Sequence, residues 1–119
     1  MSQEIVCWNR QGVVMASDSL VVLETDAGRQ VCTRRKLYPL GTHAALVSAG
    51  LAVGIELCQS VQRRVQALRL YDMARIYDLA VETLSAGYSR FRSQNLAWFE
   101  AHPGAHRRLC FCLAGYDIQ

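Results

Sequence analysis

The sequence lacks the features that mark membrane and exported proteins. None of its apolar runs approaches the roughly eighteen residues that a membrane-spanning helix requires. The first ten residues, MSQEIVCWNR, have neither the basic start nor the apolar core of a signal peptide. We therefore expect a cytoplasmic protein that does not bind a membrane.

Signals for metals, phosphate groups and nucleic acids are also scarce. Cys110 and Cys112 are the only cysteines at close spacing, with no second pair at zinc spacing, and the three histidines form no metal-binding motif. No glycine-rich phosphate loop occurs, and a net charge of +3 is too weak to demand a nucleic-acid partner. We expect no cofactor, no metal, no nucleic acid, and five reduced, buried thiols.

What the chain does contain is enough apolar residues for one core. Of its 119 residues, 51% are hydrophobic, which fits a single domain over residues 1–119. Alternating and β-branched runs bounded by turn residues predict strands over 4–9, 13–17, 20–24, 30–33, 36–40, 43–49 and 108–115. The turn before the second strand, at residues 10–12, offers Gly12 for a positive φ.

Two helices separate the last two strands. Apolar residues at three- and four-residue spacing predict helices over 50–68 and 72–101, antiparallel to each other, with Asp72 as the N-cap of the second. Their expected apolar stripes are Leu51, Ile55, Cys58, Val61, Val65 and Leu68, and then Met73, Tyr77, Ala80, Leu84, Tyr88 and Phe91. The order of strands, helix pair and final strand predicts a layered α+β domain.

Four landmarks stand in order along the chain. The run GVVMASD ends at Asp18, and Lys36 follows eighteen residues later as the only lysine beside twelve arginines. Gly50 closes VSAG fourteen residues after Lys36, and LAGYD lies near the end of the sequence. An acid after a strand, a lone amine and a glycine before a helix are the parts that an N-terminal nucleophile hydrolase requires.

These landmarks resemble the N-terminal half of proteasome-type β subunits, as in a bacterial proteasome-like homologue. Members of that family begin with a threonine nucleophile, followed by a run like GVVLAAD, a catalytic lysine and an alanine–glycine pair. Counting back from Gly12 without a gap, the resemblance puts the nucleophile at Ser2. It implies half of a four-layer αββα sandwich, truncated at its C-terminus, with peptides or unfolded proteins as substrates. A homo-oligomeric ring or a complementing half-subunit is the implied partner.

The resemblance gives each candidate site residue a chemical role. If Met1 is removed, the α-amine of Ser2 has a reference pKa of about 7.7–8.0 and can accept the proton of its own hydroxyl. Lys36 would favour the deprotonated hydroxyl through its charge, and Asp18 would hold Lys36 in place. The Gly50 amide, at the start of a helix, would donate to the oxyanion.

Each of these residues also has a structural interpretation. Asp18 can cap a turn, Lys36 can protect a strand edge, and Gly50 can simply begin a helix. Two other functions therefore stay open, namely a non-catalytic subunit of a proteasome-like ring and a small α+β binding module.

Overall fold

A computed structural model describes residues 3–117 of the chain. The elements are β1 (Glu4–Asn9), β2 (Gly12–Ser17), β3 (Leu20–Thr25), β4 (Gly28–Thr33), β5 (Leu37–Pro39), β6 (Ala44–Gly50), α1 (Val53–Leu68), α2 (Met73–Gln94), α3 (Leu96–Ala101), a 3-10 turn (Ala105–Arg107) and β7 (Leu109–Gly115). The strand pairs are all antiparallel. The predicted α+β class, with antiparallel strands, a helix pair and a final strand, is confirmed.

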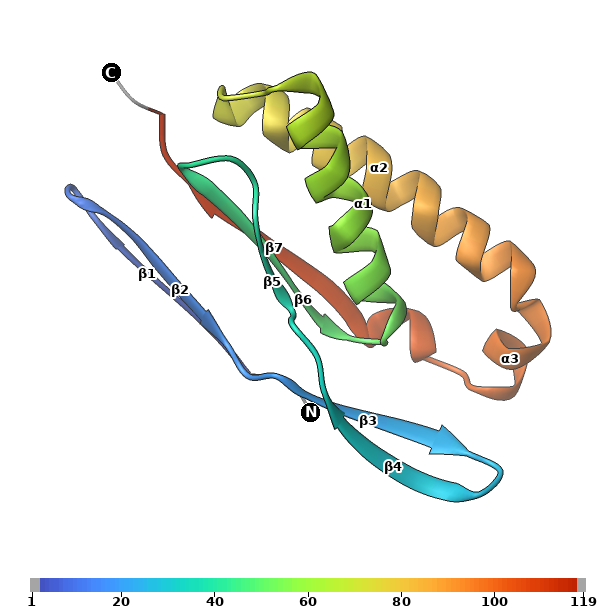
Figure 1. Cartoon of the computed structure of the whole chain (residues 1–119). Helices are drawn as coiled ribbons and strands as arrows, with labels where there is room; N and C mark the ends of the chain where they lie inside the picture. Colours follow the sequence, from blue (N-terminus) through green and yellow to red (C-terminus); the bar gives the residue numbers. More distant parts are fainter. Residues whose placement is uncertain (1–2, 118–119) are drawn as a thin grey trace.

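Within the described residues, the strands form two hairpins and one three-stranded sheet. Strand β1 pairs with β2, β3 pairs with β4, and the larger sheet has the order β5–β6–β7. Figure 1 shows α1 and α2 on one side of this sheet and the β1–β2 hairpin on the other. The β3–β4 hairpin extends away from the sheet at the end where β2 leads into β3.

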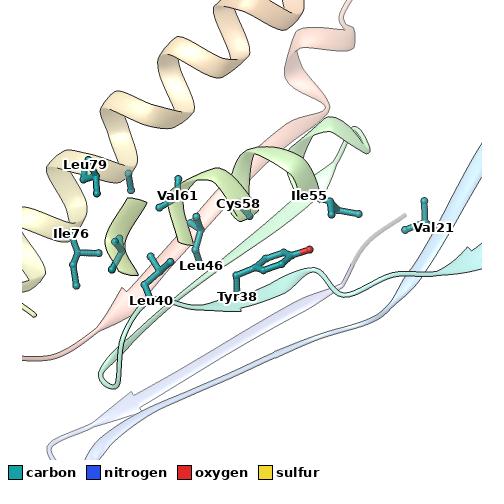
Figure 2. Close-up of a cluster of buried hydrophobic side chains, with 11 residues drawn as sticks. Val21, Tyr38, Leu40, Leu46, Ile55, Cys58, Val61, Ile76 and Leu79 are labelled. Carbon is teal, nitrogen blue, oxygen red and sulfur yellow. The ribbon is translucent and has the colours of Figure 1, made fainter. Parts of the chain in front are cut away.

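The core lies between the sheet and the helices. Figure 2 shows Tyr38 and Leu46 of the sheet facing Cys58 and Val61 of α1, with Ile76 of α2 nearby. Because side chains alternate along a strand, the even-numbered residues of β6 face the helices and the odd-numbered ones face the hairpin side.

Two residues of the expected helix stripes are exposed to solvent. Leu68 is 57% exposed because it ends α1, and Tyr77 is 57% exposed, since Ile76 and Leu79 supply the buried face instead. Asp72 does cap α2, because its carboxylate accepts a hydrogen bond from the Ala74 N–H at 2.9 Å.

The two helices approach each other closely at Gly87. A Cβ at that position would overlap the Leu57 side chain of α1, so glycine permits the contact. Arg64 of α1 donates to the Thr83 hydroxyl at 2.7 Å and lies 3.7 Å from Glu82, which joins the helices further along. Gly87 is therefore a packing position.

Three local expectations are wrong. The helix predicted over 72–101 is interrupted at Asn95, whose side-chain amide donates to the Phe91 carbonyl and competes with the helical backbone. Gly12 does not adopt a positive φ, because the Asn9 carboxamide accepts from two backbone N–H groups and closes the turn. Cys7, Cys110 and Cys112 are exposed rather than buried, the last two because they lie on the sheet face away from the helices.

Candidate active site

Asp18 and Lys36 meet where the two hairpins join. The β1–β2 ladder continues one step beyond the strands, with the Asp18 N–H donating to the Gln3 carbonyl at 3.1 Å. The β3–β4 ladder likewise continues, with the Arg34 N–H donating to the Ser19 carbonyl at 2.8 Å. The segment entering the second hairpin and the segment leaving it are thus adjacent, which brings together residues eighteen positions apart.

The two side chains form a largely buried ion pair. The Lys36 ammonium donates to the Asp18 carboxylate at 2.9 Å, with Lys36 5% exposed and Asp18 31% exposed. This hydrogen bond lowers the pKa of Asp18 below its ordinary value, and the opposing effect of desolvation is smaller. The Gln3 N–H adds a longer contact to the same carboxylate oxygen at 3.4 Å.

The lowered pKa of Asp18 predicts how the pair contributes to stability with pH. A carboxyl whose pKa is depressed by folding stabilises the native state above its unfolded pKa, here 3.8, and loses that contribution as pH falls through the lower folded value. We expect the difference in unfolding free energy between the wild type and Asp18→Asn to be constant at neutral pH and to shrink below 3.8. Urea unfolding at a series of pH values measures it, and a difference that grows on acidification would contradict the assignment.

Gly50 ends the central strand at a backbone position that requires glycine. Its φ is +98°, and a Cβ there would overlap the carbonyl oxygen of Arg108. The chain then turns through Leu51 and Ala52 before α1 begins at Val53, so Gly50 precedes the helix by a short turn. Gly50 was expected to open the helix itself, but it closes β6.

The ladder pattern fixes the direction of the Gly50 N–H. Leu51 donates to the Arg108 carbonyl at 2.9 Å, and Tyr116 donates to the His43 carbonyl at 2.9 Å. These bonds make the odd-numbered residues of β6 the ones that hydrogen-bond to β7. The Gly50 N–H therefore points away from β7, to the side of β6 on which β5 lies.

Lys36 lies on the same side of β6 as β5, because it directly precedes that strand. Strand β5 begins at Leu37, opposite Val47, so Lys36 precedes the paired residues at the end of the sheet where Gly50 lies. By register, Gly50 is two residues beyond the position opposite Lys36, or about 7 Å along the strand. The structure thus brings Asp18 and Lys36 into contact and places Gly50 on the neighbouring strand.

Ser2 lies outside the described residues. Gln3, which follows it in the sequence, is hydrogen-bonded to Asp18 through both its N–H and its carbonyl. The first described residue, Gln3, therefore lies directly beside the Asp18–Lys36 pair.

A groove that the sequence did not predict opens beside these residues. It measures about 450 Å³ and is lined by Arg34 and Leu51, neighbours of Lys36 and Gly50, and by apolar side chains that include Val21, Phe91 and Trp98. A larger groove of about 770 Å³ lies between the tip of the β1–β2 hairpin and β7. None of the described candidate residues, Asp18, Lys36 and Gly50, lines either groove. The smaller groove is the one that residues close in sequence to the site line, since Leu51 follows Gly50 directly and Arg34 precedes Lys36 by two residues.

Two observations concern metal ligands and the buried thiol of the described chain. Within residues 3–117, no three histidine, cysteine or acidic side chains gather where they could hold a metal ion. Cys58 is fully buried, and desolvation raises the pKa of its thiol to about 12, so it stays protonated at neutral pH.

Three comparisons with known proteins found no match. No protein-family model matches it, and neither a curated protein nor a solved structure does. None of the helices within residues 3–117 combines the length and apolar character needed to cross a bilayer.

Proposed function

We propose that this chain carries the nucleophile-bearing part of a proteasome-like peptidase subunit of the N-terminal nucleophile class. The observation that carries the proposal is the buried Lys36 ammonium bound to Asp18 at the point where the described chain begins. An N-terminal hydroxyl needs a positive charge nearby that stabilises its deprotonated form. The buried Lys36 ammonium, bound to Asp18 beside the N-terminal segment, can supply that charge.

The proposed reaction is the hydrolysis of a peptide bond in two steps. With Met1 removed, the Ser2 α-amine takes the hydroxyl proton as Oγ attacks the scissile carbonyl carbon, and the carbonyl oxygen becomes an oxyanion. The Gly50 N–H donates to that oxyanion, and the Lys36 ammonium stabilises the developing negative charge. The intermediate then expels the leaving amine, which takes the proton, and water hydrolyses the acyl ester to return free Ser2.

The arrangement of layers is compatible with this class. Helices α1 and α2 cover one side of the β5–β6–β7 sheet, and the β1–β2 hairpin lies on its other side (Figure 1). One helical layer followed by two β layers corresponds to three layers of an αββα sandwich. We propose this architecture on the order of the layers alone.

The groove, the exposed apolar residues and the free thiols indicate which substrate, partner and compartment to propose. A peptide or an unfolded protein could place one side chain in the apolar groove beside Leu51 while its carbonyl oxygen meets Gly50. Exposed apolar residues on both hairpins, among them Ile5, Trp8, Val14 and Val31, favour association with like chains or with a complementing half-subunit. The free thiols suit a reducing compartment, and we propose the cytoplasm.

Removal of Met1 should switch the activity on. We expect the chain beginning at Ser2 to hydrolyse fluorogenic peptide amides, because only a free α-amine can act as the base. Ser2→Ala, and a chain with one extra residue before Ser2, should both be inactive, whereas Ser2→Thr should keep the activity. Equal turnover with and without the extra residue would overturn the mechanism. No turnover by the processed chain would favour a non-catalytic ring subunit.

A further inference from the structure

The outer edge of β7 carries backbone groups that point away from the sheet. Strand β7 is last in the order β5–β6–β7, and within residues 3–117 no strand pairs with its other side. Cys110, Cys112 and Ala114 occupy the positions that hydrogen-bond to β6. The intervening residues therefore direct their N–H and carbonyl groups outward.

The two edges of this sheet differ in how they are protected. The β5 edge contains Pro39, which has no N–H to donate, and the Gln62 side chain donates to the Pro39 carbonyl at 3.0 Å. Strand β7 reads LCFCLAG and contains neither proline nor any charged residue. Natural proteins usually place such residues on a strand edge that must stay free, so β7 is the edge built to be paired.

A groove flanks the β7 edge on each face of the sheet. On the helix side, Leu84 and Tyr88 of α2 and Phe111 of β7 line a groove of about 210 Å³. On the other side, Trp8 and Cys112 line the groove of about 770 Å³. A strand added to β7 would direct alternate side chains toward each groove. Apolar side chains on both of its faces would then meet Phe111 on one side and Trp8 and Cys112 on the other.

We infer that the strand that occupies this edge is β7 of a second copy of the chain, paired antiparallel about a two-fold axis. Strand β7 is itself apolar on both faces, and the two-fold arrangement satisfies both open edges at once without leaving a new one. This inference does not depend on the chemistry at Lys36.

The register follows from the length of the strand. Full overlap of Leu109–Gly115 with its copy places Cys112 directly opposite Cys112 of the second copy, and Cys110 opposite Ala114. Cys112 is exposed and would occupy a non-hydrogen-bonded pair, where the two Cα atoms are about 4.5 Å apart. That separation lies within the range that a disulfide spans, about 4.4–6.8 Å.

The test combines mass measurement with cross-linking of the whole chain. Light scattering under reducing conditions should give a dimer. Diamide should then accept two electrons and two protons from the facing thiols and leave a disulfide-linked dimer. The link should persist in Cys110→Ser and disappear in Cys112→Ser, and Cys112→Ser should remain a dimer when reduced.

A charge at the two-fold axis should break the dimer. Cys112→Lys places two ammonium groups opposite each other and should raise the dimer dissociation constant at least about tenfold relative to Cys112→Ser. Circular dichroism would check that both variants keep their secondary structure. A monomer over the whole concentration range, a larger oligomer, or a cross-link that survives in Cys112→Ser would each overturn the inference.

Discussion

Replacing Lys36 with methionine should lower the rate of peptide-amide hydrolysis by about a hundredfold to a thousandfold, the loss typical of a group that stabilises developing charge. Methionine keeps an unbranched apolar chain in the buried site and removes only the ammonium. The Asp18 carboxylate, which is 31% exposed, can then be hydrated. The loss should appear in kcat, because the ammonium acts on charge that develops during attack.

Arg35 provides the matched control. It is the adjacent residue, is exposed, and uses its backbone carbonyl rather than its guanidinium to accept the Tyr38 hydroxyl. Arg35→Met should therefore keep near wild-type turnover. If Lys36→Met and Arg35→Met were equally active, the Asp18–Lys36 pair would be structural and the catalytic proposal would fail.

Replacing Gly50 with alanine should cost about 3 kcal/mol or more of unfolding free energy, through a strained φ and a steric overlap together. The overlap is with the Arg108 backbone, which cannot rotate away as a side chain could. Relief would require β6 and β7 to separate where they pair Gly50 with Leu109. Activity should fall as well, because the same movement displaces the Gly50 N–H.

Gly12→Ala is the control for Gly50→Ala. It shows how much unfolding free energy changes when a strand glycine without strain or overlap is replaced by alanine. Gly12 also lies in a strand, yet its φ is not positive and no heavy atom lies within 4 Å of a Cβ built there. We expect its unfolding free energy to stay within about 1 kcal/mol of wild type. Urea denaturation of both variants measures the contrast, and a Gly50→Ala variant as stable as Gly12→Ala would contradict the geometry described for β6.

The order of elements could be predicted because local patterns determine it. Strand alternation and the Asp72 cap are short-range signals, and the structure follows them. The predicted end of the second helix differs from the observed one, because a side chain there competes with the backbone for a hydrogen bond. Asn95 divides the second helix because its amide binds the Phe91 carbonyl, an interaction that apolar spacing does not reveal.

The site was less predictable because it depends on tertiary packing. The resemblance implied that Asp18 holds Lys36, but the 5% exposure of Lys36 results from two hairpins joining beside the sheet. The exposure of Cys110 and Cys112 depends on which face of β7 the helices cover, and a short apolar strand gives no indication of that. The groove beside Leu51 depends on helix placement in the same way.

The most direct measurement of the central claim is the position of a covalent adduct. The chain freed of Met1 would be treated with a peptide β-lactone, which acylates an activated hydroxyl, and the adduct would be located by peptide mass mapping. The account predicts one adduct per chain, on Ser2, absent from Ser2→Ala and strongly reduced in Lys36→Met. An adduct that persists in Ser2→Ala, on a cysteine or any other residue, would show that Ser2 is not the nucleophile.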